Sequence, residues 1–175
     1  MTEASFTGVL IGPTVVADDN PKSRELHDKS RIGELLSGKF KYSLVEALFL
    51  LESGKIEIKS EKKSITADAF TTKAQKTEKN FWIRYLVYKD LRSRGYIVKT
   101  ALKFGADFRV YDKGIKPGED HAKWIVFPVH ETTTLTWHDF SAKNRVSHST
   151  RKNLLIAVID DEECPTYYEV SWIRP

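Results

Sequence analysis

The feature that most constrains the fold is an almost uninterrupted apolar run from Ala122 to Val129, with the sequence AKWIVFPV. A strand with one face in water alternates apolar and polar residues, whereas a strand covered on both faces is apolar throughout. The run therefore predicts a central strand of a sheet that carries helices on both faces. A second apolar run, from Leu154 to Ile159, predicts another buried strand.

Signals for further elements surround these two runs. From Glu78 onward, apolar residues recur at helical spacing, and Gly95 stands where a glycine commonly ends a helix. Helix signals return at Asp139, and Phe140 and Val146 are expected to face the core. A helix followed by mixed strands with helical cover predicts an α/β domain with a mixed central sheet. The remaining strands are predicted at Tyr96–Thr100, Asp107–Asp112 and Tyr167–Ile173.

The first part of the chain predicts a separate, small α+β module. Ser43 and Glu46 form the pattern of a capping box at the start of a helix, which Gly54 ends. Residues 71–80 are rich in charge and predict a connection, so we expect domains at 1–76 and 77–175. The other expected elements are a hairpin of Phe6–Ile11 and Thr14–Ala17, a helix from Lys22 to Gly33, a strand Lys55–Lys59 and a helix Ala67–Lys73.

Composition is that of a folded intracellular protein. Hydrophobic residues make up 41% and charged residues 30%, which is ordinary for a globular chain. The single cysteine, Cys164, cannot form a disulfide within the chain. Neither a signal-peptide pattern nor an apolar stretch of ~20 residues occurs, so we expect a soluble cytoplasmic protein with no membrane partner. The net charge of +4 favours a polyanionic partner only weakly.

Three side chains that can move protons or hold negative charge lie at the edges of predicted strands: Tyr111, His121 and Lys152. Each has an ordinary structural explanation. A tyrosine at a strand edge usually packs, a loop histidine is usually solvated, and a lysine before a strand is usually a surface charge. Taken together, the three have mutually consistent roles and predict a metal-free RNA-cleaving site.

A metal-dependent nuclease is the alternative for the same kind of domain. Such enzymes hold Mg²⁺ with one acidic residue and an acid-x-Lys pair on adjacent strands. Asp107 can serve as the first acid, but the second element is HAK at residues 121–123, where a histidine stands in place of the carboxylate. Glu119 and Asp120 are displaced into the loop. The sequence therefore predicts a site with no metal ion and no cofactor.

Positive charge concentrates just before the Leu154 strand. A solvated helix face is the ordinary explanation of such a cluster. Beside a site that cleaves RNA, the cluster instead predicts contacts with phosphates. Its members are Lys143, Arg145, His148, Arg151 and Lys152.

Several strings in order carry a resemblance to a known family: FGADFRVYDKG, EDHAKWIVFPV, and SHSTRKNLLIAVIDDEE followed by TYYEVSWIRP. They are similar to the archaeal tRNA-splicing endonuclease family, whose small N-terminal module resembles YSLVEALFLLESGKIEI. The resemblance implies a restriction-endonuclease-like C-terminal domain that removes introns from precursor tRNA at a bulge-helix-bulge structure. It also implies metal-independent cleavage that leaves a 2′,3′-cyclic phosphate and a 5′-hydroxyl. The family's catalytic Tyr, His and Lys correspond to Tyr111, His121 and Lys152.

The chemistry of such a site follows from RNA itself, because the 2′-OH is a nucleophile within the substrate. His121 is the expected general acid, since a histidine side chain ordinarily titrates near pH ~6.5. Tyr111 is expected to act as the general base or to orient the 2′-OH, and these alternatives stay open. A phenol is a costly base unless a cation lies near it. Lys152 would supply that cation and stabilise the pentavalent phosphorus.

The resemblance also implies RNA contacts and an assembly. Arg145 fits the position of a base-stacking arginine by its spacing to Lys152, and Arg174 is a weaker candidate. An acidic loop is expected to dock into another subunit and the last strand to pair with its copy, so a homotetramer is the simplest assembly. A catalytically silent structural or RNA-binding subunit is the remaining alternative, although Tyr111, His121 and Lys152 argue against it. The predicted interface residues are Asp160, Asp161, Glu162, Glu163, Tyr168, Val170 and Trp172.

Overall fold

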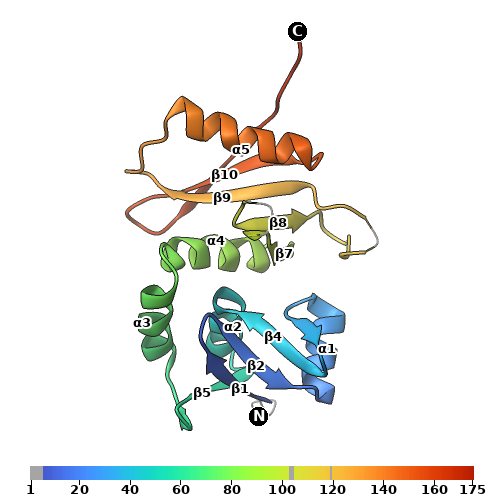
Figure 1. Ribbon diagram of the computed structural model, residues 1–175, viewed down its shortest axis with the longest axis vertical. Coiled ribbons are helices and arrows are strands. Elements are labelled where there is room, and N and C mark those ends of the chain that lie inside the picture. The colour runs from blue at the N-terminus through green and yellow to red at the C-terminus, as the bar shows by residue number, and fades with distance from the viewer. Residues whose placement is uncertain (1–5, 103–104, 119) are drawn as a thin grey trace. The chain divides into compact units, whose positions relative to one another are not determined.

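The structure, a computed structural model, describes residues 6–102, 105–118 and 120–175. The chain divides into two compact units, residues 1–82 and 83–175, and each is described by itself. The described residues form five helices and two mixed sheets, which confirms the predicted α/β (α+β) class (Figure 1). Within these same residues, every helix is too short or too polar to cross a membrane.

The N-terminal unit is built on a sheet in the order β3-β4-β2-β1-β5-β6. The predicted hairpin is present, because β1 and β2 pair antiparallel across a turn in which Gly12 has a positive φ of 56°. β1 also pairs with β5 in parallel. The strands are β1 (Phe6–Ile11), β2 (Thr14–Asp18), β3 (Glu34–Leu36), β4 (Lys39–Ser43), β5 (Ile56–Ser60) and β6 (Lys63–Ser64).

Glu46 ties the helix α2 (Leu44–Glu52) to its surroundings. Its Oε2 accepts the backbone N–H of Ser43 at 2.9 Å, which with the Ser43 hydroxyl completes the predicted capping box. Its Oε1 accepts the backbone N–H of Gly33 at 3.1 Å. Gly33 has a φ of 79°, and a Cβ there would lie 2.6 Å from the ring of Tyr42. Glycine is therefore required at this position both for the backbone conformation and for close packing.

Two helices of this unit differ from their predicted bounds. α1 (Pro21–Ser30) begins one residue earlier, because the Asn20 side chain accepts the N–H groups of Lys22 and Ser23 as its N-cap. It ends before Gly33, at a left-handed Arg31. α3 (Ala67–Thr77) continues through most of the predicted connection at 71–80, so that prediction was wrong. Phe70 and Ala74, one helical turn apart, are both buried and give this helix an apolar contact.

The C-terminal unit contains a five-stranded sheet in the order β11-β10-β9-β8-β7. β9, which contains most of the AKWIVFPV run, is the central strand as predicted; it pairs in parallel with β10 and antiparallel with β8. Figure 1 shows the helices α4 and α5 on opposite faces of this sheet. The elements are α4 (Phe81–Ser93), β7 (Ile97–Thr100), β8 (Phe108–Tyr111), β9 (Trp124–His130), α5 (Trp137–Ser149), β10 (Asn153–Ile159) and β11 (Pro165–Val170).

Both faces of the central strands are covered, as the apolar runs require. On the α4 side, the rings of Tyr88 and Phe108 lie 5.9 Å apart. On the α5 side, Phe140 and Val146 pack against a buried cluster of five residues, which confirms their predicted direction. The cluster consists of Ala101, Ala106, Ile125, Phe127 and Leu154.

The last strand is shorter than predicted. β11 ends at Val170, which pairs with Leu154 near the start of β10. Because β10 begins only one residue earlier, at Asn153, a longer β11 would have no partner strand. Trp172 and Ile173 therefore lie outside the sheet, and both are exposed.

Candidate active site

The strand register brings three distant parts of the chain to one end of the C-terminal sheet. Trp124, the first residue of β9, pairs with Val110 near the end of β8 and with Asn153 at the start of β10. Tyr111 directly follows Val110, and Lys152 directly precedes Asn153. The loop that carries His121 enters β9 at the same end. The mixed sheet, with an antiparallel and a parallel neighbour of β9, is what makes these ends coincide.

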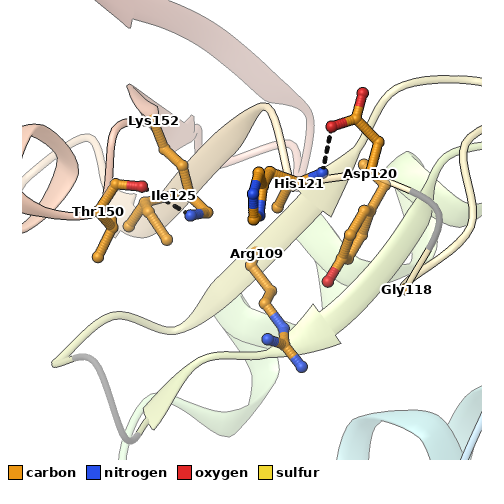
Figure 2. Close-up of a pocket in the computed structure, with 9 residues that line it drawn as sticks. Arg109, Gly118, Asp120, His121, Ile125, Thr150 and Lys152 are labelled. Atoms are coloured by element: carbon orange, nitrogen blue, oxygen red, sulfur yellow. Dashed lines mark hydrogen bonds between the residues drawn. The ribbon is translucent and has the colours of Figure 1, made fainter.

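A pocket of about 330 Å³ opens at this end of the sheet. Tyr111, His121 and Lys152 all line it, so the structure brings the three predicted residues together. They come from a strand end, a loop and the junction that follows α5, and Figure 2 shows His121 and Lys152 at the pocket. The other lining residues are Arg109, Gly118, Asp120, Ala122, Ile125 and Thr150.

The three side chains differ in exposure. Tyr111 is 5% exposed, so its ring packs in the protein as a tyrosine at a strand edge ordinarily does, and it also forms part of the pocket wall. His121 is exposed, and Lys152 is half-buried. The arrangement thus has a fixed phenol at the wall, an accessible imidazole and a partly desolvated ammonium.

The end of α5 positions Lys152. Thr150 is the C-cap residue, and its hydroxyl donates to the carbonyl of Val146 at 2.8 Å. Arg151 then adopts a left-handed φ of 54°, which turns the chain into β10. The Nζ of Lys152 donates to the carbonyl oxygen of Thr150 at 2.8 Å, as Figure 2 shows. Burial lowers the pKa of Lys152 below its ordinary value, and the charge of Arg109 lowers it further.

The loop before β9 is held by Asp120. Its Oδ1 accepts the backbone N–H of His121 at 2.6 Å, which fixes the backbone next to the imidazole (Figure 2). Asp120 is the one carboxylate among the described residues that line the pocket. Glu119, which the sequence analysis placed in this loop, lies outside the described residues.

Asp107, the first of the acidic residues that a metal-dependent nuclease would require, forms an ion pair with Arg84. Its Oδ1 lies 2.7 Å from the Nε of Arg84, which is 7% exposed. Burial raises the pKa of Asp107, and the charge of Arg84 partly offsets this. Asp107 does not line the pocket. In residues 6–102, 105–118 and 120–175, no group of three or more His, Cys, Asp or Glu side chains is placed to hold a metal ion.

The residues predicted to contact RNA have varied positions. Arg151 lines a second pocket of about 240 Å³, which shares Lys152 with the first. Lys143 is half-buried, and its Nζ lies 4.1 Å from the ring centre of Phe127. Arg145 and Arg174 are exposed, and with Lys143 they line neither of these two pockets.

Trp172, predicted as an interface residue, also lines the second pocket. Its ring centre lies 4.8 Å from that of His148, and the side chain is 61% exposed. Two other predicted interface residues lie on the edge strand β11. Tyr168 is 57% exposed, whereas Val170 packs against the core cluster.

The acidic residues Asp160 to Glu163 lie in the loop between β10 and β11. Asp160 organises this loop, because its Oδ1 accepts the N–H groups of Glu162 at 3.0 Å and Cys164 at 2.8 Å. The carboxylates of Asp161, Glu162 and Glu163 are exposed. Asp161 also has contacts outside the loop: its Oδ1 lies 3.4 Å from the Nε2 of His130, and its backbone N–H donates to Glu131. The loop thus presents three acidic side chains at the surface, held by Asp160.

Arg109 is the pocket residue that the sequence analysis missed. It is a charged residue within an apolar strand, two positions before Tyr111, and alternation along a strand places such residues on the same face. This alternation is visible in the sequence. The proximity of Arg109 to Lys152 is not, because it depends on the register across β8, β9 and β10.

Comparison with known proteins places this chain in a family. The tRNA intron endonuclease catalytic C-terminal domain matches residues 81–167, and the tRNA intron endonuclease N-terminal domain matches residues 6–71. The tRNA-splicing endonuclease of Thermococcus gammatolerans is 40% identical over 165 residues, which cover 94% of this chain and 96% of that protein.

Two more relatives come from other archaea. The tRNA-splicing endonuclease of Methanothermobacter thermautotrophicus is 42% identical over 153 residues, 87% of this chain and 89% of that protein. That of Nanoarchaeum equitans is 43% identical over 138 residues, 75% of this chain and 88% of that protein. Both domain matches and these identities over most of the chain agree, and the chain belongs to the tRNA intron endonuclease family.

Proposed function

We propose that this protein cleaves precursor tRNA at intron boundaries within bulge-helix-bulge RNA, without a metal ion, and leaves a 2′,3′-cyclic phosphate and a 5′-hydroxyl. The observation that carries the proposal is the convergence of Tyr111, His121 and Lys152 on one pocket from three parts of the chain. A phenol, an imidazole and an ammonium in one pocket are sufficient for acid–base catalysis of an internal transesterification.

In the proposed reaction, the 2′-oxygen attacks the adjacent phosphorus while the bond from phosphorus to the 5′-oxygen breaks. As a phenolate, Tyr111 accepts the proton of the 2′-OH; as a phenol, it orients the 2′-OH while solvent water takes the proton. Its low exposure supports either role, since a ring held by packing keeps its hydroxyl in one place. Lys152, which lines the same pocket, is proposed as the cation that assists this phenol.

His121 is the proposed general acid and donates its proton to the leaving 5′-oxygen. Its exposed position lets it reach a strand that lies across the pocket mouth. Lys152 is proposed to stabilise the charge that builds on the non-bridging oxygens. Its contact with the Thr150 carbonyl orients the ammonium before the substrate arrives.

Metal-free cleavage is supported by the ion pair of Asp107 and Arg84. A metal site in this fold would require Asp107 to give up a partner that lies 2.7 Å away in a largely buried environment. Histidine at residue 121 does not offer the hard oxygen that Mg²⁺ prefers.

For RNA binding, we propose that the basic residues around α5 contact the phosphates and the unpaired bases of the bulge. Exposed arginines next to a cleavage pocket can pair with phosphates and stack on splayed bases. Arg151 is adjacent to Lys152, which favours contact with the strand that is cut. The residues proposed for this role are Lys143, Arg145, Arg151 and Arg174.

A homotetramer is the proposed assembly, with the acidic loop docked into another subunit and β11 paired with its copy. β11 is an edge strand, and such a strand presents unpaired backbone groups to a partner. The side chains proposed for this interface are Asp160, Asp161, Glu162, Glu163, Tyr168, Val170 and Trp172.

Reversing the exposed charges of the acidic loop should weaken the tetramer and cleavage together. We expect a variant with lysine at Asp161, Glu162 and Glu163 to sediment as smaller species and to cleave slowly at the same concentration. Asp160 is left unchanged, because its carboxylate holds the loop.

The matched control carries lysine at three exposed acids of the N-terminal unit, Asp28, Glu52 and Glu61. It has the same change in net charge and should remain assembled and active. A loop variant that stays tetrameric and active would contradict docking through this loop.

The proposed function is tested with a bulge-helix-bulge RNA and the same RNA with its bulges closed by base pairs. We expect cuts only in the bulges, with 5′-hydroxyl ends that accept a label from a kinase without prior phosphatase treatment. The 3′ ends should resist phosphatase until acid opens the cyclic phosphate. RNA that is bound but remains uncut would instead indicate a silent RNA-binding subunit.

A further inference from the structure

Arg109 occupies the candidate active site on the same face of the sheet as Tyr111. Successive side chains of a strand alternate between faces, so residues two apart on β8 share one face. In the register, Arg109 lies opposite Ile125 of β9, and Ile125 is itself part of the pocket wall. A permanently charged guanidinium is therefore built into the wall of a pocket where three other groups are proposed to act on a phosphate.

The pocket has an excess of positive charge among its described lining residues. Arg109 and Lys152 are cations, whereas the carboxylate of Asp120 already accepts the backbone N–H of His121. The charge of Arg109 contributes to the lowered pKa of Lys152, so the two cations are close enough to repel each other. An anion in the pocket would relieve this repulsion.

A third cation adds to the same field. Lys99 of β7 lies directly opposite Arg109 and is 8% exposed.

Arg109 and Lys152 do not aim at one point. Figure 2 shows the guanidinium of Arg109 directed away from the ammonium of Lys152. A single phosphate between the two is therefore not the arrangement that the side chains favour. A strand of RNA offers a phosphate at every nucleotide, so two cations in one pocket can each take one of two neighbouring phosphates.

We propose that Arg109 binds the RNA phosphate adjacent to the scissile phosphate and so fixes the register of the strand in the pocket. The proposal rests on the proposed function, in which Lys152 serves the scissile phosphate itself. Guanidinium suits this task, because two parallel N–H groups can bind two oxygens of one phosphate.

The test is a double-mutant cycle between Arg109→Gln and single methylphosphonates in the RNA. Each methylphosphonate removes the charge of one phosphate near the cut, and a 2′-deoxy nucleotide at the cleavage site keeps the RNA intact. Binding is measured against salt concentration. We expect wild-type protein to lose about tenfold in affinity when the adjacent phosphate is neutralised, and Arg109→Gln to lose little from the same change. The salt slope of Arg109→Gln should also fall by about 0.7.

Arg109→Lys and Lys89→Gln complete the set. Arg109→Lys keeps the charge and should keep the salt slope, while losing the paired hydrogen bonds. Lys89 is an exposed cation on α4, across the sheet from α5. Lys89→Gln should lose as much affinity as wild type when the adjacent phosphate is neutralised. If Arg109→Gln does not fold, wild type and Arg109→Lys are compared on the same RNAs. An equal loss of affinity in both proteins when the adjacent phosphate is neutralised would contradict the proposal.

The outcomes separate this inference from the proposed function. Wild-type protein that does not cleave the unmodified RNA would overturn the proposed function. If wild-type protein cleaves, but the losses of affinity caused by Arg109→Gln and by each methylphosphonate simply add, only the role of Arg109 is overturned. A role confined to packing would change the melting temperature and leave the salt slope as it is.

Discussion

His121→Ala should lower the rate of a single turnover by ~10²- to 10⁴-fold while leaving the affinity for RNA and the melting temperature nearly unchanged. The imidazole is the proposed source of the proton for the leaving 5′-oxygen, and a positioned general acid typically contributes a factor of this size. His121 is exposed, so its loss leaves no cavity in the core. The measurement is the rate with enzyme in excess over RNA, together with a binding curve on 2′-deoxy RNA.

His138→Ala is the matched control. His138 is also exposed and lies in the first turn of α5, at the opposite end of that helix from Thr150 and Lys152. The His138→Ala variant should cleave at the wild-type rate. A near-normal rate for His121→Ala would remove the histidine from the proposed chemistry, and a general loss of folding would show in the melting temperature of both variants.

Lys152→Met should lower the cleavage rate by ~10²- to 10³-fold, because it removes the charge that opposes the negative charge on phosphorus. Methionine keeps an unbranched apolar side chain of similar reach, so the half-buried position stays filled. Lys89→Met, on the exposed side of α4, is the control for the loss of one positive charge. An active Lys152→Met would contradict the charge-stabilising role.

The pH dependence of residual cleavage by His121→Ala gives a second test of Lys152, because loss of a proton from His121 cannot limit the rate in that variant. The pKa of Lys152 is lowered by burial and by the charge of Arg109, so the ammonium loses its proton at a lower pH than an ordinary lysine does. If the ammonium is required, the residual cleavage falls as pH rises through this lowered pKa. Adding Arg109→Gln removes one of the two causes, so the alkaline limb should move to higher pH. An alkaline limb unchanged by this second substitution would argue against Lys152 as the titrating group.

The fold of the C-terminal unit follows closely from the sequence because its signals are strong and local. A continuous apolar run has to be covered on both faces, and AKWIVFPV became the central strand β9. The extension of α3 beyond the predicted end at Lys73, through residues 74–77, was missed, because a charged composition hid the one-turn spacing of Phe70 and Ala74. The end of β11 at Val170 was missed for a different reason, since it depends on where its partner strand begins.

The candidate site could be predicted only in part. The strand-edge positions of Tyr111, His121 and Lys152 were visible, and the resemblance supplied their grouping. Their convergence depends on Trp124 pairing with β8 on one side and β10 on the other, and register across three strands is a property of the folded sheet. Arg109 was missed for the same reason, because only the register brings its charge near Lys152.

Cleavage of one bulge-helix-bulge RNA in excess EDTA tests the central claim most directly. Three side chains are proposed to act on the 2′-OH and the scissile phosphate without an ion, so wild-type protein should cleave at the same rate with EDTA as with Mg²⁺. Replacing the 2′-OH at the cut by hydrogen should stop cleavage under both conditions. Strict dependence on Mg²⁺, or cleavage of the 2′-deoxy RNA, would contradict the account.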